Sequence, residues 1–145
     1  MESLGGYVFA VQGGKLWKVG VSGKGAQECG SGWGGTEAMA RVGSYIYAVQ
    51  GGKLWRFGVS GKNSQNMGSG WGGTKAMASD GRYLYALQGG KLWRFDPQTK
   101  KSVAMNGIYN GTIKDSNWSL PDAMTSVGAD LFIVQGGKLW KSRMK

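Results

Sequence analysis

The sequence predicts an all-β fold, a β-propeller of four antiparallel blades, from three observations. One unit recurs four times: the string Ala-Val-Gln-Gly-Gly-Lys-Leu-Trp, or a variant that differs at its first or second position, spans residues 10–17, 48–55, 86–93 and 133–140. Within each unit the residue pattern has a period of two, which is typical of strands and not of helices. Glycine supplies 28 of the 145 residues, against roughly 7% in average proteins, whereas only two residues are proline. Since 12% of the residues are aromatic, which is enough for a core, the glycine must serve to turn the chain.

A complete unit is predicted to contain four strands, A to D, joined by turns. In the second unit, strand B is residues 45–49 and strand C is residues 53–57, both rich in β-branched and aromatic residues. Gly51 and Gly52 between them fit a two-residue hairpin turn, which requires positive φ at both positions. Short Ala-Met-Ala segments predict strand A, and residues 63–67 predict a weaker strand D. Such a four-stranded meander, repeated every 38 to 47 residues, is a propeller blade, and no helix of any length is expected.

The length predicts a single domain with repeat units at approximately residues 1–38, 39–76, 77–122 and 123–145. Alignment of the units places Met1 opposite Met39, so the first unit begins inside strand A, and the last unit ends just after strand C. Four copies of strands A to C are therefore expected with three copies of strand D, and the last blade lacks its outer strand. Two arrangements stay open: a small four-bladed ring with one three-stranded blade, or an open arc that a second copy completes at its unpaired edge, as a homo-oligomer.

The composition excludes several classes of function. The chain has no histidine and a single cysteine, Cys29, so Ser-His-Asp catalysis, histidine zinc sites and an intrachain disulfide are absent. The eight carboxylates occupy positions that mostly differ between units, so the chain is not expected to be an enzyme or to need a cofactor or metal. No apolar run approaches the roughly 20 residues of a transmembrane segment. The N-terminus lacks the profile of a signal peptide, so synthesis in the cytoplasm is expected, and the final location, including export by a non-classical route, stays open.

Residues 70–87, followed by Gly-Lys-Leu-Trp-Arg at 90–94, resemble a tectonin repeat, which has a Trp, a short strand ending in Asp-Gly, and a strand of the Leu-Tyr-Ala-Val kind. The same residues resemble the tachylectin-2 repeat, which shares a Gly-rich loop with Trp. A weaker likeness links residues 121–124 and 138–141 to hemopexin-type blades. Both lectin families are β-propellers, so the resemblance implies carbohydrate binding, often to microbial or foreign glycans, by several equivalent sites at blade junctions. Multivalent recognition or agglutination, as in innate defence, is the function it implies.

The topology of a meander indicates where a ligand would bind. Successive connections alternate between the two ends of the strands, so the B–C turn and the Trp-bearing D–A loop are expected on the same face. Sugar recognition uses an aromatic ring, planar amides and closely approaching backbone, and this face offers all three. The loop residues Trp33, Trp71 and Trp118 are expected to be less packed than Trp17, Trp55, Trp93 and Trp140, which lie within strands and are assigned to the core. The predicted carbohydrate-binding residues are Trp33, Gly34, Gly35, Thr36, Trp71, Gly72, Gly73, Thr74, Trp118, Gln12, Gln50, Gln88, Gln135, Lys53 and Lys91.

These residues also have structural interpretations that stay open. The glutamines could cap the hairpins, the glycine pairs are required by the turns, and Thr36 and Thr74 could simply begin strand A. The loop tryptophans could fill the space between blades, and the lysines could be solvated strand ends.

The charge supports an alternative function. The chain has 18 Lys and Arg against 8 Asp and Glu, a formal charge of +10, which favours anionic partners. The basic residues are spread through the repeats and no nucleic-acid-binding motif is present, so no specific nucleic-acid partner is expected. The alternative is therefore a non-catalytic adhesion or scaffold module that binds polyanions or a protein.

Overall fold

A computed structural model describes residues 1–105, 121–127, 130–135 and 138–143. Regular secondary structure in these residues consists of strands, as the sequence predicts. A search of the same residues finds no helix long and apolar enough to cross a membrane. The chain divides into two compact units, Met1–Gly72 and Gly73–Lys145, and each is described by itself.

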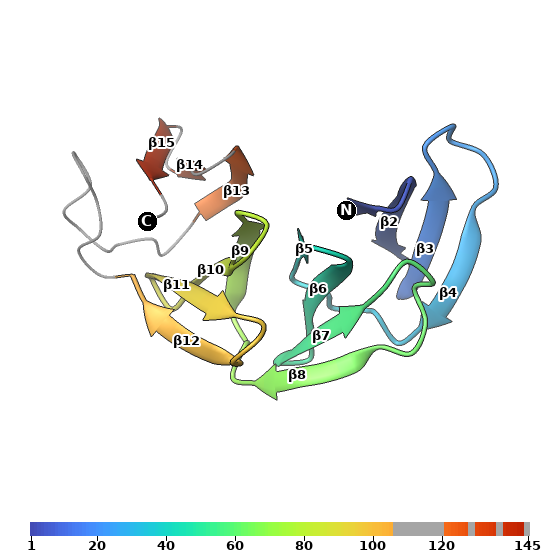
Figure 1. The fold of residues 1–145 in the computed structure, drawn as a ribbon, viewed down its shortest axis with the longest axis horizontal. Helices are drawn as coiled ribbons and strands as arrows, with labels where there is room; N and C mark the ends of the chain where they lie inside the picture. The colour runs from blue at the N-terminus through green and yellow to red at the C-terminus, as the bar shows by residue number, and fades with distance from the viewer. Residues whose placement is uncertain (106–120, 128–129, 136–137, 144–145) are drawn as a thin grey trace. The chain divides into compact units, whose positions relative to one another are not determined.

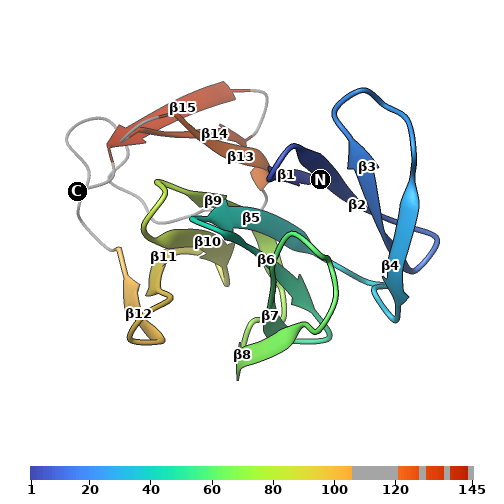
Figure 2. The ribbon, with the colours of Figure 1, turned by 45° about the vertical axis from the view of Figure 1, so that its right-hand side comes forward.

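The first unit contains two four-stranded antiparallel sheets, each with its strands in sequence order (Figures 1 and 2). The first sheet consists of β1 (Glu2–Leu4), β2 (Tyr7–Gln12), β3 (Lys15–Gly20) and β4 (Gln27–Ser31). The second sheet consists of β5 (Ala38–Val42), β6 (Tyr45–Gln50), β7 (Lys53–Phe57) and β8 (Gln65–Ser69). These strands are the predicted strands A to D of the first two repeats.

The second unit contains one four-stranded and one three-stranded antiparallel sheet. The four-stranded sheet consists of β9 (Thr74–Ser79), β10 (Leu84–Gln88), β11 (Lys91–Asp96) and β12 (Lys101–Ala104). The other consists of β13 (Pro121–Val127), β14 (Asp130–Gln135) and β15 (Lys138–Arg143). The prediction of four antiparallel blades, the last without its outer strand, is confirmed for the described residues.

The predicted glycine turns join strands B and C. At the second hairpin Gly51 and Gly52 have φ of 59° and 73°, and the register pairs Gln50 with Lys53 directly across the turn. Both φ values lie in the left-handed region, which side chains with a Cβ rarely adopt. The two glycines are therefore required by the hairpin itself.

Each unit has a hydrophobic core between its two sheets. In the first unit the core cluster is Leu4, Phe9, Leu16, Trp33, Ile46, Ala48 and Phe57. In the second unit it is Ala76, Ala78, Tyr85, Leu87, Leu92, Met105, Leu131 and Ile133. Each cluster takes side chains from both sheets of its unit, so the two blades of a unit bury apolar surface against each other.

The outer strands β4 and β8 each contain a β-bulge at the same repeat position. The register of β3 against β4 shifts between Leu16 and Trp17, and that of β7 against β8 shifts between Leu54 and Trp55. The extra residue is Cys29 in the first blade and Met67 in the second. Cys29 packs against the core cluster and Met67 is 5% exposed, so the bulge turns the extra side chain inward.

Candidate functional site: a cleft between the first two blades

The loop after each outer strand of the first unit is hydrogen-bonded to the B–C hairpin of its own blade. The Trp33 N–H donates to the Gly14 carbonyl at 2.9 Å, and the Trp71 N–H donates to the Gly52 carbonyl at 3.0 Å. The prediction that Trp-bearing loops and B–C hairpins share a face is therefore confirmed for the first unit.

Gln50, at the end of β6 in the second blade, connects this loop to the next blade. Its side-chain Nε2 donates to the carbonyls of Gly32 and Gly34, at 2.9 and 3.2 Å. Both amide hydrogens are thus used to hold the loop of the first blade. No described residue donates a hydrogen bond to the Oε1 atom of Gln50, so this oxygen remains an available acceptor.

The loop approaches the hairpin so closely that glycine faces glycine. A Cβ built on Gly34 would lie 3.8 Å from the Gly14 Cα, and one built on Gly72 would lie 3.8 Å from the Gly52 Cα. These distances are ordinary van der Waals contacts, so the backbones of the loop and the hairpin pack directly against each other.

The burial of the tryptophans differs from the sequence prediction. Trp33 and Trp71, expected to be less packed, are only 8% and 7% exposed, and the Trp33 ring packs edge-on against Phe57 at 5.4 Å between centroids. That expectation is wrong: the backbone of each loop is hydrogen-bonded to a hairpin, and the Trp33 side chain belongs to the core cluster of the first unit. Trp17, Trp55 and Trp93, assigned to the core, are half-buried, and Trp55 packs against the core cluster of the first unit.

Trp55 lies across the end of its own hairpin. Its Nε1–H points to the Gln50 carbonyl at 3.3 Å, and the corresponding Nε1–H of Trp17 points to the Gln12 carbonyl at 3.4 Å. The polar edge of the indole is therefore directed at the hairpin, and part of the ring stays open to solvent.

A cleft of about 190 Å³ lies between the first two blades, beside these groups. It is lined by Ser31, Gly32, Trp33, Gln50, Trp55 and Ser64. The sequence predicted Trp33 and Gln50 as site residues but not Ser31, Gly32, Trp55 or Ser64. The available signal for Trp55 was its place two residues after Lys53, because alternate residues of a strand point to the same side. Nothing in the sequence singled out Ser64, which precedes β8.

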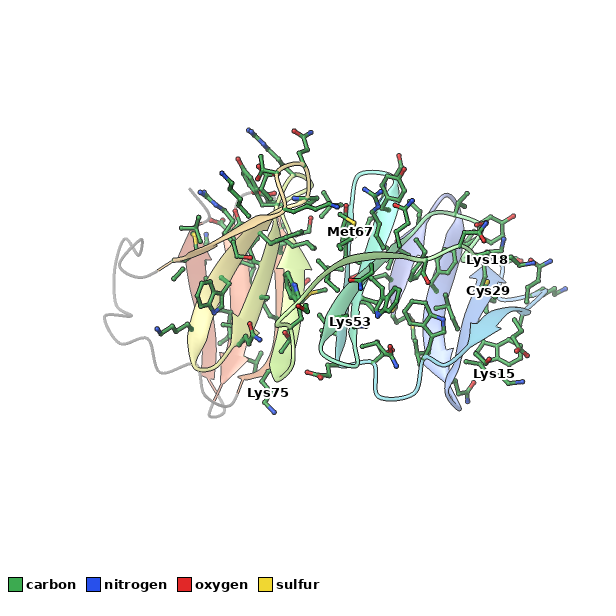
Figure 3. The ribbon with its side chains drawn as sticks, turned by 90° about the horizontal axis from the view of Figure 1, so that it is seen from below. Lys15, Lys18, Cys29, Lys53, Met67 and Lys75 are labelled. Atoms are coloured by element: carbon green, nitrogen blue, oxygen red, sulfur yellow. The ribbon has the colours of Figure 1, made fainter. Side chains whose placement is uncertain are left out.

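The predicted lysines differ in their surroundings. Lys53 is exposed and its Nζ lies 6.0 Å from the centroid of the Trp55 ring. Lys15, at the same place in the first blade, forms an ion pair with Glu28 at 2.8 Å. Figure 3 shows Lys15 and Lys53 toward the lower edge of the first unit. Lys91, at the start of β11, is exposed.

The remaining predicted site residues lie as follows. The Thr36 hydroxyl donates to the Trp33 carbonyl at 2.7 Å, and Thr74 is only 2% exposed, so both threonines have structural roles. Gln12 is exposed at the end of β2 and Gln88 is half-buried at the end of β10. Gly35 and Gly73 have positive φ in their loops. Trp118 lies outside the described residues, and Gln135 is described only as the last residue of β14.

The cleft has the chemistry of a binding site. Its lining combines two tryptophans, two serines, a glutamine and a glycine, and it contains no charged side chain. No group of three or more Cys, Asp or Glu residues that could hold a metal occurs in the described residues.

Comparisons with known proteins show the fold. No family model matches the chain, and no curated protein matches it. A symmetrical protein studied for its de novo evolutionary emergence is 18% identical, with a TM-score of 0.68 over 94% of this chain and 65% of that one. An auxiliary nutrient binding protein from Bacteroides thetaiotaomicron is 13% identical, with a TM-score of 0.71 over 95% of this chain and 35% of that one. TolB from Acinetobacter baumannii is 13% identical, with a TM-score of 0.56 over 89% of this chain and 37% of that one.

These structures are similar to the chain as β-propeller-like proteins, so the predicted propeller fold is confirmed. The chain spans less than two thirds of the length of each of the three.

Proposed function

We propose that the chain is a carbohydrate-binding protein of the tectonin or tachylectin-2 kind, with a sugar site in the cleft between the first two blades. The observation that carries the proposal is the half-buried Trp55 indole beside the Gln50 amide in that cleft. A pyranose presents C–H bonds on one face, which stack on an aromatic ring, and hydroxyls at its edge, which need amide and hydroxyl partners.

The size and rigidity of the cleft support a small ligand. Its volume of about 190 Å³ is below the roughly 300–1,000 Å³ of pockets for drug-sized ligands, and so suits a single sugar ring. Because both amide hydrogens of Gln50 are fixed to the loop, the Oε1 acceptor is held in place before a ligand arrives. Such preorganisation reduces the entropy lost on binding.

The repeats extend the proposal to multivalent binding. The third repeat carries a glutamine and a tryptophan, Gln88 and Trp93, at the positions of Gln50 and Trp55. Several weak sites on one chain give a glycan-coated surface much tighter binding than one site alone. Agglutination of such surfaces, as in defence, is the activity expected from this arrangement.

The test is a glycan array at low and raised salt, followed by calorimetry with two matched variants. Trp17 has the same place and the same hairpin hydrogen bond in the first blade but does not line the cleft. Trp55→Ala should remove one binding site per chain, or all binding if the cleft is the single site, whereas Trp17→Ala should leave binding unchanged. Equal effects of the two substitutions, or no sugar bound by the parent, would overturn the proposal.

The charge of +10 favours a second candidate function, an adhesion or scaffold module for polyanions or a protein. Binding that ignores sugar identity and disappears in moderate salt would support it, because salt screens contacts between exposed charges.

A further inference from the structure

We propose that the sugar bound in this cleft is acidic, and that Lys53 pairs with its carboxylate or sulfate. This inference rests on the proposed carbohydrate function and names the class of sugar. It is carried by a difference between the first two blades, which are otherwise close repeats.

In the first blade the hairpin lysine is neutralised from within the blade. The Nζ of Lys15 lies 2.8 Å from the Glu28 carboxylate of the outer strand. In the second blade the position of Glu28 is occupied by Asn66. The Asn66 Oδ1 accepts a hydrogen bond from the Gly68 N–H at 2.9 Å instead.

Lys53 is therefore a cation without an acidic partner among the described residues. It is exposed, and its Nζ stands 6.0 Å from the centroid of the Trp55 ring that lines the cleft. Since Lys53 and Trp55 are two residues apart on β7, their side chains leave the same side of the strand. The positive charge thus lies near a residue that lines the cleft, beside the ring on which a sugar would stack.

The surroundings of this lysine favour an anion. The six lining residues carry no carboxylate that would repel one. A sugar stacked on the indole would present its exocyclic substituents at the rim, where an acidic group forms a charge-assisted hydrogen bond with an ammonium. Lysine acts as a compact point charge with no fixed donor geometry, so the site accepts a carboxylate or a sulfate.

The experiment measures affinity by calorimetry for sugars that differ only in charge. One pair is a short oligogalacturonate and its methyl ester, and the other is a galactose oligosaccharide with and without O-sulfate. The parent protein should bind the acidic member of at least one pair about fivefold more tightly. A preference in the first pair indicates that Lys53 pairs with a carboxylate, and a preference in the second pair indicates that it pairs with a sulfate.

Two substitutions, each with a control substitution, assign the preference to Lys53. Lys53→Met should remove the preference for the acidic sugar. Lys62 is an exposed lysine before β8, and Lys62→Met lowers the net charge by the same amount but should leave the preference intact. Asn66→Glu recreates the ion pair of the first blade and should also remove the preference, with Asn66→Gln as the uncharged control.

The outcomes separate this inference from the proposed function. Equal affinity for acidic and neutral sugars, or a preference that survives in Lys53→Met, overturns the acidic class and leaves a neutral-sugar lectin. Failure of every sugar to bind, or sugar binding unaffected by Trp55→Ala, overturns the proposed function together with this inference.

Discussion

Replacing Trp33 by alanine should destabilise the protein far more than replacing Trp55, the reverse of what their places in a loop and a strand indicate. Trp33 is 8% exposed and packs on Phe57 within the core of the first unit. A buried tryptophan removes about 200 Å² from water, which at about 25 cal/mol per Å² corresponds to about 5 kcal/mol. Measured Trp→Ala changes in cores of about 3–5 kcal/mol agree with this value.

The half-buried Trp55 should contribute less. Truncation loses about half as much buried area, together with one N–H···O contact to the Gln50 carbonyl. We expect Trp55→Ala to lower the free energy of unfolding by about 1–3 kcal/mol. Because small proteins are stable by only about 5–15 kcal/mol, Trp33→Ala could leave the first unit mostly unfolded while Trp55→Ala stays folded.

Urea unfolding followed by far-UV circular dichroism measures both changes. The slope of the free energy of unfolding against urea concentration should be unchanged for Trp55→Ala, since the same surface is exposed on unfolding. Trp33→Phe, which retains a ring near Phe57, should recover part of the loss. Equal destabilisation by the two alanine substitutions, or a larger effect at Trp55, would refute the burial argument for the loop tryptophan.

Three further predictions test the turns, the loop contact and the core. Gly23 and Gly61 occupy equivalent turns with φ of 76° and 69°, but only a Cβ on Gly61 would meet Cys29, at 2.6 Å from Sγ. In thermal unfolding, Gly23→Ala should lower the free energy of unfolding by about 1–2 kcal/mol, and Gly61→Ala should lower it clearly more. Adding Cys29→Ala to Gly61→Ala should restore part of the lost stability. Gln50→Ala should lower the free energy of unfolding, measured with urea, by about 1–2 kcal/mol. Gln50→Glu should lower it more, because a carboxylate would face two carbonyl oxygens. Burial raises the pKa of the Tyr85 phenol above its ordinary value of 10, so the unfolded chain releases this proton first and the free energy of unfolding should fall as pH rises above 10. In urea titrations at alkaline pH, Tyr85→Phe should reduce the slope of the free energy of unfolding against pH by up to about 1.4 kcal/mol per pH unit. An unchanged slope would contradict the raised pKa of Tyr85.

The fold was predictable from the sequence because its determinants are local. A Gly-Gly pair fixes the hairpin between strands B and C wherever it occurs, and Gly51 and Gly52 have the required positive φ. The strand pattern flanks this turn in every repeat, so the blades follow from each repeat separately. The shared face of the hairpins and the Trp-bearing loops also follows, because the connections of a meander alternate between its two ends.

The site was only partly predictable because its determinants are not local. Trp33 is buried against residues that are distant in the sequence, such as Phe57, and its backbone is held to Gly14, 19 residues earlier. The cleft also needs Ser64 from one blade beside Ser31 from the other. No spacing in a single sequence indicates such a pairing of side chains, nor that Trp55 packs against the core and also lines the cleft.

The contacts change how the repeat itself should be interpreted. Gln-Gly-Gly recurs in all four hairpins and Trp-Gly-Gly in the loops at Trp33 and Trp71, whereas the third loop has Trp-Ser-Leu. In the first unit these residues hold each loop to its hairpin, and Gln50 also holds the first loop to the second blade. These contacts give the repeated residues a structural role that does not depend on a ligand. Residues that differ between repeats, such as Glu28 and Asn66, leave the backbone unchanged but alter the charge beside the hairpin lysine. Selectivity for a ligand should consequently follow from the variable positions, and repeats with the same fold should differ in the sugars that they bind.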